Sequence, residues 1–308
     1  MSLTNAPDTD SVYRLTDLEN WKFEGVSLAV IGHPIAHSIS PAMHNAALSL
    51  MSHDDSNFSH WRYFKFDILP EDLSSALPLF YKNNFFGLNL TLPHKVEAVP
   101  LIAKVDPAAQ HVGAVNTLHW QDDGYHGYNT DGYGLEKAIQ CDLDTEFKEA
   151  TVILLGAGGA GRSAAVQSLE GECKALWIGN RNQAHLAALL NSLHTHRSFS
   201  KVVGFALSSP PPNLPETGLL INATSLGLQK EDPSPIDLDR FEQSLKIYDL
   251  IYKPANTALL RDAASRGIKG AHGLTMLVWQ GARSLEIWSE ASVPTEVMLS
   301  AARKALSL

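Results

Sequence analysis

The sequence is poor in cysteine, in excess positive charge and in long apolar runs, and each shortage excludes a class of protein. Its 308 residues include two cysteines, Cys141 and Cys173, which cannot form a disulfide framework and which we interpret as reduced and non-catalytic. Acidic side chains outnumber basic ones by 33 to 24, so the formal net charge of −9 argues against nucleic acid or an anionic membrane as a partner.

No stretch reaches the roughly 18 consecutive apolar residues of a membrane-spanning helix. Residues 1–10 are polar and acidic and lack the apolar core of a signal peptide. We therefore expect a cytoplasmic protein. Its expected partner is a small-molecule substrate, bound by a monomer or a homodimer.

The first half of the chain alternates strand-like and helix-like segments. The predicted strands span residues 27–31, 61–67, 86–92, 115–120 and 125–128, the last two flanking a turn at 122–124. The predicted helices span residues 70–81 and 93–103. A third begins at Ser40 and Pro41, where the Ser40 hydroxyl is expected to cap free amides. This alternation predicts an α/β domain.

The second half alternates more regularly. Its predicted strands span residues 151–155, 175–178, 202–206, 219–222 and 247–252, and its predicted helices span 160–169 and 257–266. Such a pattern predicts a Rossmann-like, doubly wound parallel sheet. A last helix over 273–282 is expected to return to the first domain. The predicted domains are therefore 1–131 with 274–308, and 132–273.

A glycine-rich string separates the first strand and the first helix of the second half. Gly156, Gly158 and Gly161 fit the pattern G-x-G-x-x-G, in which the glycines allow a tight turn, room for a pyrophosphate and close helix packing. The amides that open the helix favour phosphate. We interpret the string as a dinucleotide-binding loop, the alternative being a glycine-rich turn of another α/β protein.

The residues after the second strand of this half select the cofactor. An acid there would bond the ribose hydroxyls of NAD, whereas a cation accommodates the 2′-phosphate of NADP. The chain carries Asn180, Arg181 and Asn182, with no acid. NADP is therefore favoured, although NAD use stays open and Arg181 could be a solvated surface charge.

Two short strings carry candidate proton-transfer residues, Lys95 in Asn-Leu-Thr-Leu-Pro-His-Lys and Asp131 in Tyr-Asn-Thr-Asp-Gly. Removing a hydride from an alcohol carbon requires a base for the hydroxyl proton. A lysine with a lowered pKa, positioned by a carboxylate, can supply it. The simpler interpretations are an exposed lysine at a helix start and a helix-capping aspartate.

Small polar residues gather at the ends of the predicted elements of the first half. They are Ser38, Ser40, Asn89, Thr91, Asn116 and Asn129. Buried hydroxyls and amides discriminate strongly in favour of a ligand that matches them group for group, so the cluster suits a hydroxylated substrate. Each residue alone could equally serve a turn or a cap.

Taken together, these strings closely resemble the shikimate dehydrogenase family. The matching segments are residues 30–41, 89–95, 113–117, 129–132, 222–225, 248–252 and 273–282. The resemblance implies two α/β domains around a cleft and the reversible, NADPH-dependent reduction of 3-dehydroshikimate to shikimate, on the route to chorismate and the aromatic amino acids.

The resemblance also implies roles for individual residues. Ser38 and Ser40 would bind the substrate carboxylate, and Thr91, Asn116, Tyr252 and Gln280 would complete the substrate contacts beside Asn89. Lys95 would be the general acid and base, with Asp131 as its partner. The cofactor residues would be Gly156, Ala157, Gly158, Gly159, Ala160, Asn180, Arg181, Asn182, His185, Leu250 and Gly273.

Three features depart from the family pattern. Asn182 replaces a common threonine, and His185 stands where a second cation is frequent, which leaves room for dual use of NAD. Leu228 replaces a common methionine. About 25 residues precede the usual start, including residues 13–21, for which a packing helix or a dimer contact is expected.

Three alternatives complete the analysis. The nearest is a quinate/shikimate dehydrogenase, which the retained Ser38 and Ser40 disfavour. A non-catalytic nucleotide sensor would have no need for Lys95 and Asp131. A metal enzyme is disfavoured because His33 and His37 flank Pro34 in a predicted loop and no His-Glu-x-x-His string occurs.

Overall fold

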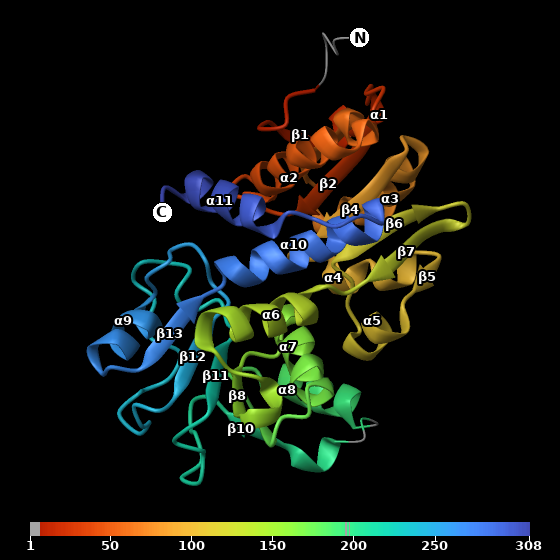
Figure 1. Cartoon of the computed structure of the whole chain (residues 1–308). Coiled ribbons are helices and arrows are strands. Elements are labelled where there is room, and N and C mark those ends of the chain that lie inside the picture. Colours follow the sequence, from red (N-terminus) through yellow and green to blue (C-terminus); the bar gives the residue numbers. More distant parts are fainter. Residues whose placement is uncertain (1–6, 195, 197) are drawn as a thin grey trace. The chain divides into compact units, whose positions relative to one another are not determined.

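The computed structural model describes residues 7–194, 196 and 198–308 (Figure 1). The chain divides into two compact units. Unit 1 contains the described residues up to Thr130 together with Gly281–Leu308, and unit 2 is Asp131–Gln280. The boundaries predicted from the sequence were residues 131 and 274. Both units are α/β, as predicted.

Unit 1 is built on a seven-stranded mixed sheet in the order β1-β3-β2-β4-β6-β7-β5. The strands are β1 (Val12–Arg14), β2 (Val26–Gly32), β3 (Trp61–Asp67), β4 (Phe85–Leu90), β5 (Lys104–Val105), β6 (Thr117–Gln121) and β7 (Gly124–Tyr128). The first four in the sheet are parallel, while β6 is antiparallel to both β4 and β7. The five predicted strands are present with small shifts at their ends.

The helices of unit 1 are α1 (Leu15–Glu19), α2 (Ser40–Asp54), α3 (Leu73–Lys82), α4 (His94–Glu97), α5 (Pro107–Val112) and α11 (Thr295–Leu306). The second part of α10 (Leu274–Ser289) also belongs to this unit. Helix α11 packs along α2, so the end of the chain lies against its first third (Figure 1).

The predicted helix over 93–103 is wrong beyond its first turn. Helix α4 ends at Glu97, a short 3₁₀ turn follows, and residues 104–105 form β5. In a continuing helix the carbonyl of Lys95 would accept from the amide of Val99. Here it accepts from the amide of Val115 at 2.8 Å, and Pro100 has no amide to continue the ladder.

The N-terminal extension adds an edge strand and an aromatic cover to unit 1. Tyr13 pairs in parallel register with Phe66 of β3. The ring of Trp21 lies 4.9 Å from that of Phe64, 5.2 Å from that of Phe66 and 5.3 Å from that of Phe85. The segment therefore packs on the sheet, which confirms the packing role; the dimer contact stays a prediction.

Unit 2 is built on a six-stranded parallel sheet in the order β10-β9-β8-β11-β12-β13. The strands are β8 (Thr151–Leu155), β9 (Ala175–Asn180), β10 (Val202–Ala206), β11 (Leu219–Asn222), β12 (Lys246–Asp249) and β13 (Lys269–His272). Counted from β8, the order is that of the Rossmann fold, with its switch point between β8 and β11. The predicted sheet is confirmed.

The helices of unit 2 are α6 (Asp131–Leu143), α7 (Gly159–Glu170), α8 (Gln183–Leu193), α9 (Ala258–Ser265) and the start of α10. Figure 1 shows α9 beside β13. The strand predicted over 247–252 ends early, because the Asp249 carboxylate takes the amide of Ile251 at 3.2 Å. Strand β13 was missed because Lys-Gly-Ala-His lacks an apolar pattern.

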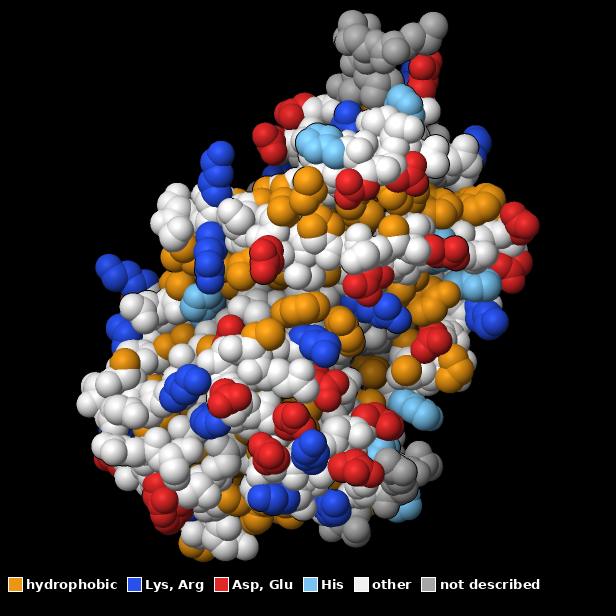
Figure 2. Space-filling model, viewed as in Figure 1, with side chains coloured by type: hydrophobic (Ala, Val, Ile, Leu, Met, Phe, Trp, Pro, Cys, Tyr) orange, Lys and Arg blue, Asp and Glu red, His pale blue; other side chains and the backbone are white. Residues whose placement is uncertain are grey.

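Among the described residues, no helix is long and apolar enough to cross a membrane. On the face shown in Figure 2, Lys and Arg side chains are interspersed with Asp and Glu. That mixture agrees with the modest acidic excess of the composition.

Replacing Trp21 tests the aromatic cover. We expect Trp21→Ala to lower the free energy of unfolding by about 2 to 3 kcal/mol, since a large ring leaves a cavity beside three others. Urea titration followed by circular dichroism measures it. Val12→Ala, at a side chain that is 37% exposed in the same segment, should cost less than about 0.5 kcal/mol. Equal losses for the two variants would contradict the packing role.

Candidate functional site

In the glycine loop of unit 2, a different structural feature explains each of the three glycines. Gly156 has φ +111°, which other residues rarely adopt, and its amide donates to Gly179 at 2.8 Å. A Cβ on Gly161 would lie 2.3 Å from the carbonyl oxygen of Gly156, so α7 packs directly on the loop. A Cβ on Gly158 would meet nothing within 4 Å. The space above Gly158 is therefore open to a ligand.

This loop lies at the switch point of the sheet. After β8 and β11 the chain diverges, and the amide of Ala223 donates to the carbonyl of Leu155 at 2.7 Å. Helix α7 begins at Gly159, and the first amides of a helix have no acceptor within it. Residues 156–160 thus present backbone donors beside an open space, which fits a pyrophosphate.

The turn after β9 presents a cation at the carboxyl edge of the same sheet. Arg181 and His185 are exposed. The Asn182 side chain accepts from the amides of Ala184 and His185 at 2.9 and 3.1 Å, so it caps α8. The Asn180 amide donates to the carbonyl of Asn182 at 2.7 Å. Both asparagines therefore shape the turn that carries Arg181.

The segments that follow β12 and β13 approach each other closely. A Cβ on Gly273 would lie 2.1 Å from the carbonyl oxygen of Leu250, so only glycine fits there. Asp249 accepts hydrogen bonds from Asn222 and Thr257, and burial raises the pKa of its carboxyl. Asp249 thus joins the ends of β11 and β12, a role that the sequence analysis did not assign.

Tyr252, Asp131 and Gln280 are the other candidates in unit 2. Burial raises the pKa of the Tyr252 hydroxyl, which is neutral at pH 7. Asp131 is the first residue of α6 and is 3% exposed. The Gln280 amide donates to the carbonyl of Leu277 at 2.9 Å on α10.

In unit 1, Ser38 and Ser40 lie at the start of α2. The helix begins at Ser40, and Pro41 occupies its first turn as predicted. The predicted cap is wrong, because Ser40 is already the first residue of the helix and Ile39 occupies the N-cap position. The amide of Ser40 donates to the hydroxyl of Ser38 at 3.3 Å. Ser38 stands two residues ahead, where its oxygen can reach that amide.

The side chain of His44 contacts the first turn of α2. Its Nδ1 lies 2.9 Å from the carbonyl oxygen of Ser40, and its ring stacks on Tyr63 with centroids 3.9 Å apart. Burial lowers the pKa of His44 to about 4, so the imidazole is neutral at pH 7. No charge is therefore added beside the serines by this ring.

Asn89 and Asn116 are buried at the ends of β4 and β6. Asn89 accepts from the Tyr63 hydroxyl at 2.7 Å and donates to the Ser284 hydroxyl at 2.9 Å. Asn116 accepts from the amide of Thr130 at 2.8 Å and donates to its hydroxyl at 2.9 Å. The structure therefore brings these two asparagines into one hydrogen-bond network.

Thr91 and Lys95 follow β4 closely. The amide of Thr91 donates to the carbonyl of Ile31 at 3.0 Å, and the backbone of Lys95 is held by Val115. The Lys95 side chain is partly buried. Asn129, also a candidate, donates to the carbonyl of Ala114 at 3.0 Å.

Sequence reasoning assigned no role to four residues of this region. Thr117 and Thr130 lie inside segments 113–117 and 129–132, which contain Asn116 and Asp131 and resemble the family. The sequence therefore contained a signal for these two residues. Tyr63 and Ser284 are distant in sequence from every string that bonds to them, and no local pattern marks them. The structure alone shows that they matter.

No metal site was expected. Among the described residues, no group of three or more His, Cys, Asp or Glu side chains is placed to hold a metal ion. The Nδ1 of His33 lies 2.6 Å from a carboxylate oxygen of Asp67.

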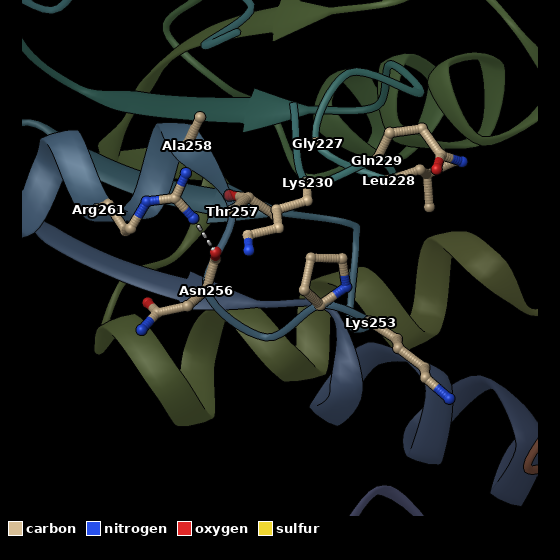
Figure 3. A pocket seen from close by; sticks show the side chains of 10 residues that line it. Gly227, Leu228, Gln229, Lys230, Lys253, Asn256, Thr257, Ala258 and Arg261 are labelled. Atoms are coloured by element: carbon tan, nitrogen blue, oxygen red, sulfur yellow. Dashed lines mark hydrogen bonds between the residues drawn. The ribbon is translucent and has the colours of Figure 1, made fainter. Parts of the chain in front are cut away.

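A hollow of about 390 Å³ lies elsewhere in unit 2, between the loops that follow β11 and β12. Its lining includes three cations, Lys230, Lys253 and Arg261, and the variant residue Leu228. Figure 3 shows Lys230 and Arg261 pointing toward each other, while Arg261 donates to the carbonyl of Asn256 at 2.5 Å. None of the candidate site residues lines this hollow.

Comparison with known proteins gives one consistent result. A family model for the shikimate dehydrogenase substrate binding domain matches residues 30–118, and a model for the shikimate 5'-dehydrogenase C-terminal domain matches residues 273–303. The chain is 38% identical to a shikimate dehydrogenase (NADP(+)) of Methanocella arvoryzae, covering 90% of this chain and 98% of that protein. It is 35% identical to the enzyme of the same name from Geobacter metallireducens, covering 88% and 93%.

Solved structures agree. The crystal structure of shikimate 5-dehydrogenase from Thermus thermophilus in complex with NADP(H) and shikimate superposes with a TM-score of 0.78. The sequence identity is 35%, and the match covers 91% of this chain and 99% of that one.

Two glycine variants test the loop. Gly158 has φ −79° and ψ −169°, which alanine accepts, and its Cβ would enter open space. Gly158→Ala should therefore leave the melting temperature unchanged but weaken NADP binding on the order of tenfold or more, because the methyl occupies the proposed phosphate space.

Gly161→Ala is the matched control. Its methyl overlaps the carbonyl of Gly156, so we expect it to lower stability by about 1 to 3 kcal/mol. Calorimetric titration with NADP and thermal unfolding measure both variants. Unchanged NADP binding in Gly158→Ala would contradict the assignment of the loop.

Proposed function

The chain belongs to the shikimate dehydrogenase family, and from this membership we propose that it catalyses the reversible, NADPH-dependent reduction of 3-dehydroshikimate to shikimate. That reaction lies on the route to chorismate and the aromatic amino acids. The observation that carries the proposal is the occurrence, in one chain, of a glycine loop at a Rossmann switch point and the polar strings around Lys95 and Asp131. Relatives with this activity in their names match nearly the whole chain.

We assign the cofactor to unit 2. Residues 156–160 (Gly156, Ala157, Gly158, Gly159 and Ala160) would hold the pyrophosphate, and Arg181 and His185 would face the 2′-phosphate. Asn180 and Asn182 would act by holding the turn. Leu250 and Gly273 would lie beside the nicotinamide, which supplies the hydride when NADPH is bound.

We assign the substrate to polar residues of both units. Ser38 and Ser40 would bind the carboxylate, and Thr91, Asn116, Tyr252 and Gln280 would bind the hydroxyls and remaining oxygens. Asn89 would support the other substrate-binding residues, because its side-chain amide is already bonded to Tyr63 and Ser284.

Proton transfer falls to Lys95. In the reductive direction its ammonium would give a proton to the carbonyl oxygen, which becomes the hydroxyl of shikimate. In the oxidative direction the neutral amine would take that proton back. Asp131 would orient the amine and stabilise its charged form. Location in the cytoplasm and a monomeric or homodimeric state stay predictions.

A quinate/shikimate dehydrogenase with NAD or dual cofactor use is the second candidate. The observation that favours it is His185, an exposed imidazole where a permanent cation is frequent. Ser38 and Ser40 favour shikimate. The values of kcat/KM for shikimate and quinate, each with NADP and with NAD, decide between the two candidates.

Removing the amine of Lys95 tests the proposed chemistry. We expect Lys95→Ala to lower kcat by about two to four orders of magnitude with little change in KM, since a general acid and base is lost while binding is kept. Steady-state oxidation of shikimate measures both constants. NADP binding should be unchanged, which shows that the variant is folded, and a near-normal kcat would refute the role.

Removing the cation of Arg181 tests the choice of cofactor. Arg181→Ala should weaken NADPH binding by about 10- to 100-fold, the scale of a charge-assisted hydrogen bond, and leave NADH binding nearly unchanged. Lys174→Ala is the matched control, because Lys174 is an exposed cation just before the amino end of the same strand, β9. Equal losses for NADPH and NADH would show that Arg181 does not read the 2′-phosphate.

A further inference from the structure

Three buried hydroxyl groups meet in the interior of unit 1. The Thr117 hydroxyl lies 2.7 Å from that of Ser284 and 3.4 Å from that of Thr130, and the Ser284 and Thr130 hydroxyls are 3.3 Å apart. The three side chains are at most 2% exposed. We call Thr117, Thr130 and Ser284 the hydroxyl cluster.

The hydroxyl cluster joins the amides of Asn89 and Asn116. The Nδ2 of Asn89 lies 2.9 Å from the Ser284 oxygen and 3.2 Å from the Thr117 oxygen. On the other side, Thr117 donates to the Oδ1 of Asn116 at 3.0 Å, and the Nδ2 of Asn116 donates to Thr130 at 2.9 Å. Each amide therefore has a partner on both its oxygen and its nitrogen.

The donor and the acceptor are defined at the bonds that involve the two amides. Burial raises the pKa of Tyr63 well above its ordinary value, so its hydroxyl is neutral and donates to the Oδ1 of Asn89. The Asn89 nitrogen then faces the hydroxyl cluster and also donates to the backbone carbonyl of Asn116 at 3.0 Å, so a flip of this amide would set its oxygen against that carbonyl. A flip of the Asn116 amide would set its nitrogen against the backbone amide of Thr130, which now donates to its oxygen at 2.8 Å. Bonds arranged in this way polarise and strengthen one another.

The members of this network stand close in sequence to several of the proposed substrate and proton-transfer residues. Asn89 ends the strand that leads to Thr91 and Lys95, and Thr117 follows Asn116. Thr130 immediately precedes Asp131 in the chain. Ser284 lies on α10, one turn after Gln280.

We propose that Thr117, Thr130 and Ser284 are positioning residues, which fix the amide orientations of Asn89 and Asn116 for substrate binding. The proposal rests on the function proposed above. The hydroxyls touch neither substrate nor cofactor in this scheme. They act through the two asparagines, so their loss should affect shikimate and spare NADP.

The pair Thr117→Val and Thr117→Ser separates the hydroxyl from the shape of the side chain. Valine keeps the branched shape in strand β6 and removes the hydroxyl, whereas serine keeps the hydroxyl. We expect Thr117→Val to raise KM for shikimate by about five- to tenfold, the scale of one lost hydrogen bond, with kcat and KM for NADP changed less than about twofold. Thr117→Ser should restore KM to within about twofold.

Ser284→Ala provides a second variant at the other side of the cluster, and Ser168→Ala is its control. Ser168 is also a fully buried helical serine, but in unit 2, where its hydroxyl donates to the carbonyl of Ala164 at 2.7 Å. Ser284→Ala should raise KM for shikimate as Thr117→Val does, and Ser168→Ala should not.

Side-chain amide exchange by NMR gives a readout that needs no turnover. The amide protons of Asn89 and Asn116 should exchange faster with solvent in Thr117→Val than in the wild type. Unchanged exchange, or equal losses for shikimate and NADP, would overturn the positioning role. If the wild type neither binds nor oxidises shikimate, the proposed function fails, and the exchange rates still decide whether the cluster holds the amides.

Discussion

A side-chain amide that is removed from water needs partners for one oxygen and for two N–H groups, and in unit 1 this requirement falls on Asn89 and Asn116. The side-chain partners are Tyr63, Thr117, Thr130 and Ser284, of which Thr117 is the sequence neighbour of Asn116 and the others come from separate segments. Asn89 therefore depends on the pairing of the sheet and on the docking of α10, and Asn116 depends on the segment that carries Thr130. The orientation of the polar residues is set by the fold of the whole unit and not by a local turn.

Unit 2 meets a different constraint, which is close approach of backbone to backbone. Gly156, Gly161 and Gly273 each lie where a Cβ would overlap a carbonyl group. The absence of a side chain lets α7 pack on the loop and lets the chain after β13 pack on the chain after β12. A surface of backbone amides is well suited to phosphate, whose oxygens accept from several directions. Unit 1 thus offers side-chain amides and hydroxyls, which suit the proposed substrate, and unit 2 offers backbone amides, which suit the proposed cofactor.

This difference explains which features the sequence could predict. The glycine loop is local, so Gly156, Gly158 and Gly161 predict the strand, the turn and the helix around them. The parallel sheet of unit 2 followed from regular alternation, and only β13, with its polar and short residues, was missed. In unit 1 five of the seven sheet strands were predicted, and the short edge strands β1 and β5 were missed. The helix beyond Glu97 was wrong, because a bond from Val115 to Lys95 replaced a helical one.

Networks that join distant segments leave no such local trace. Asn89 and Asn116 were recognised as polar residues at strand ends, yet two partners of Asn89, Tyr63 and Ser284, lie 26 and 195 positions away from it in the chain. A buried hydroxyl such as Ser284 resembles any helical serine until the fold places it 2.9 Å from an amide. Removing it takes one of three acceptors from the Asn89 nitrogen, which keeps the carbonyl of Asn116 at 3.0 Å and the hydroxyl of Thr117 at 3.2 Å, so the effect is felt at the amide. Residues of this kind influence binding without contacting the ligand, and only the folded chain identifies them.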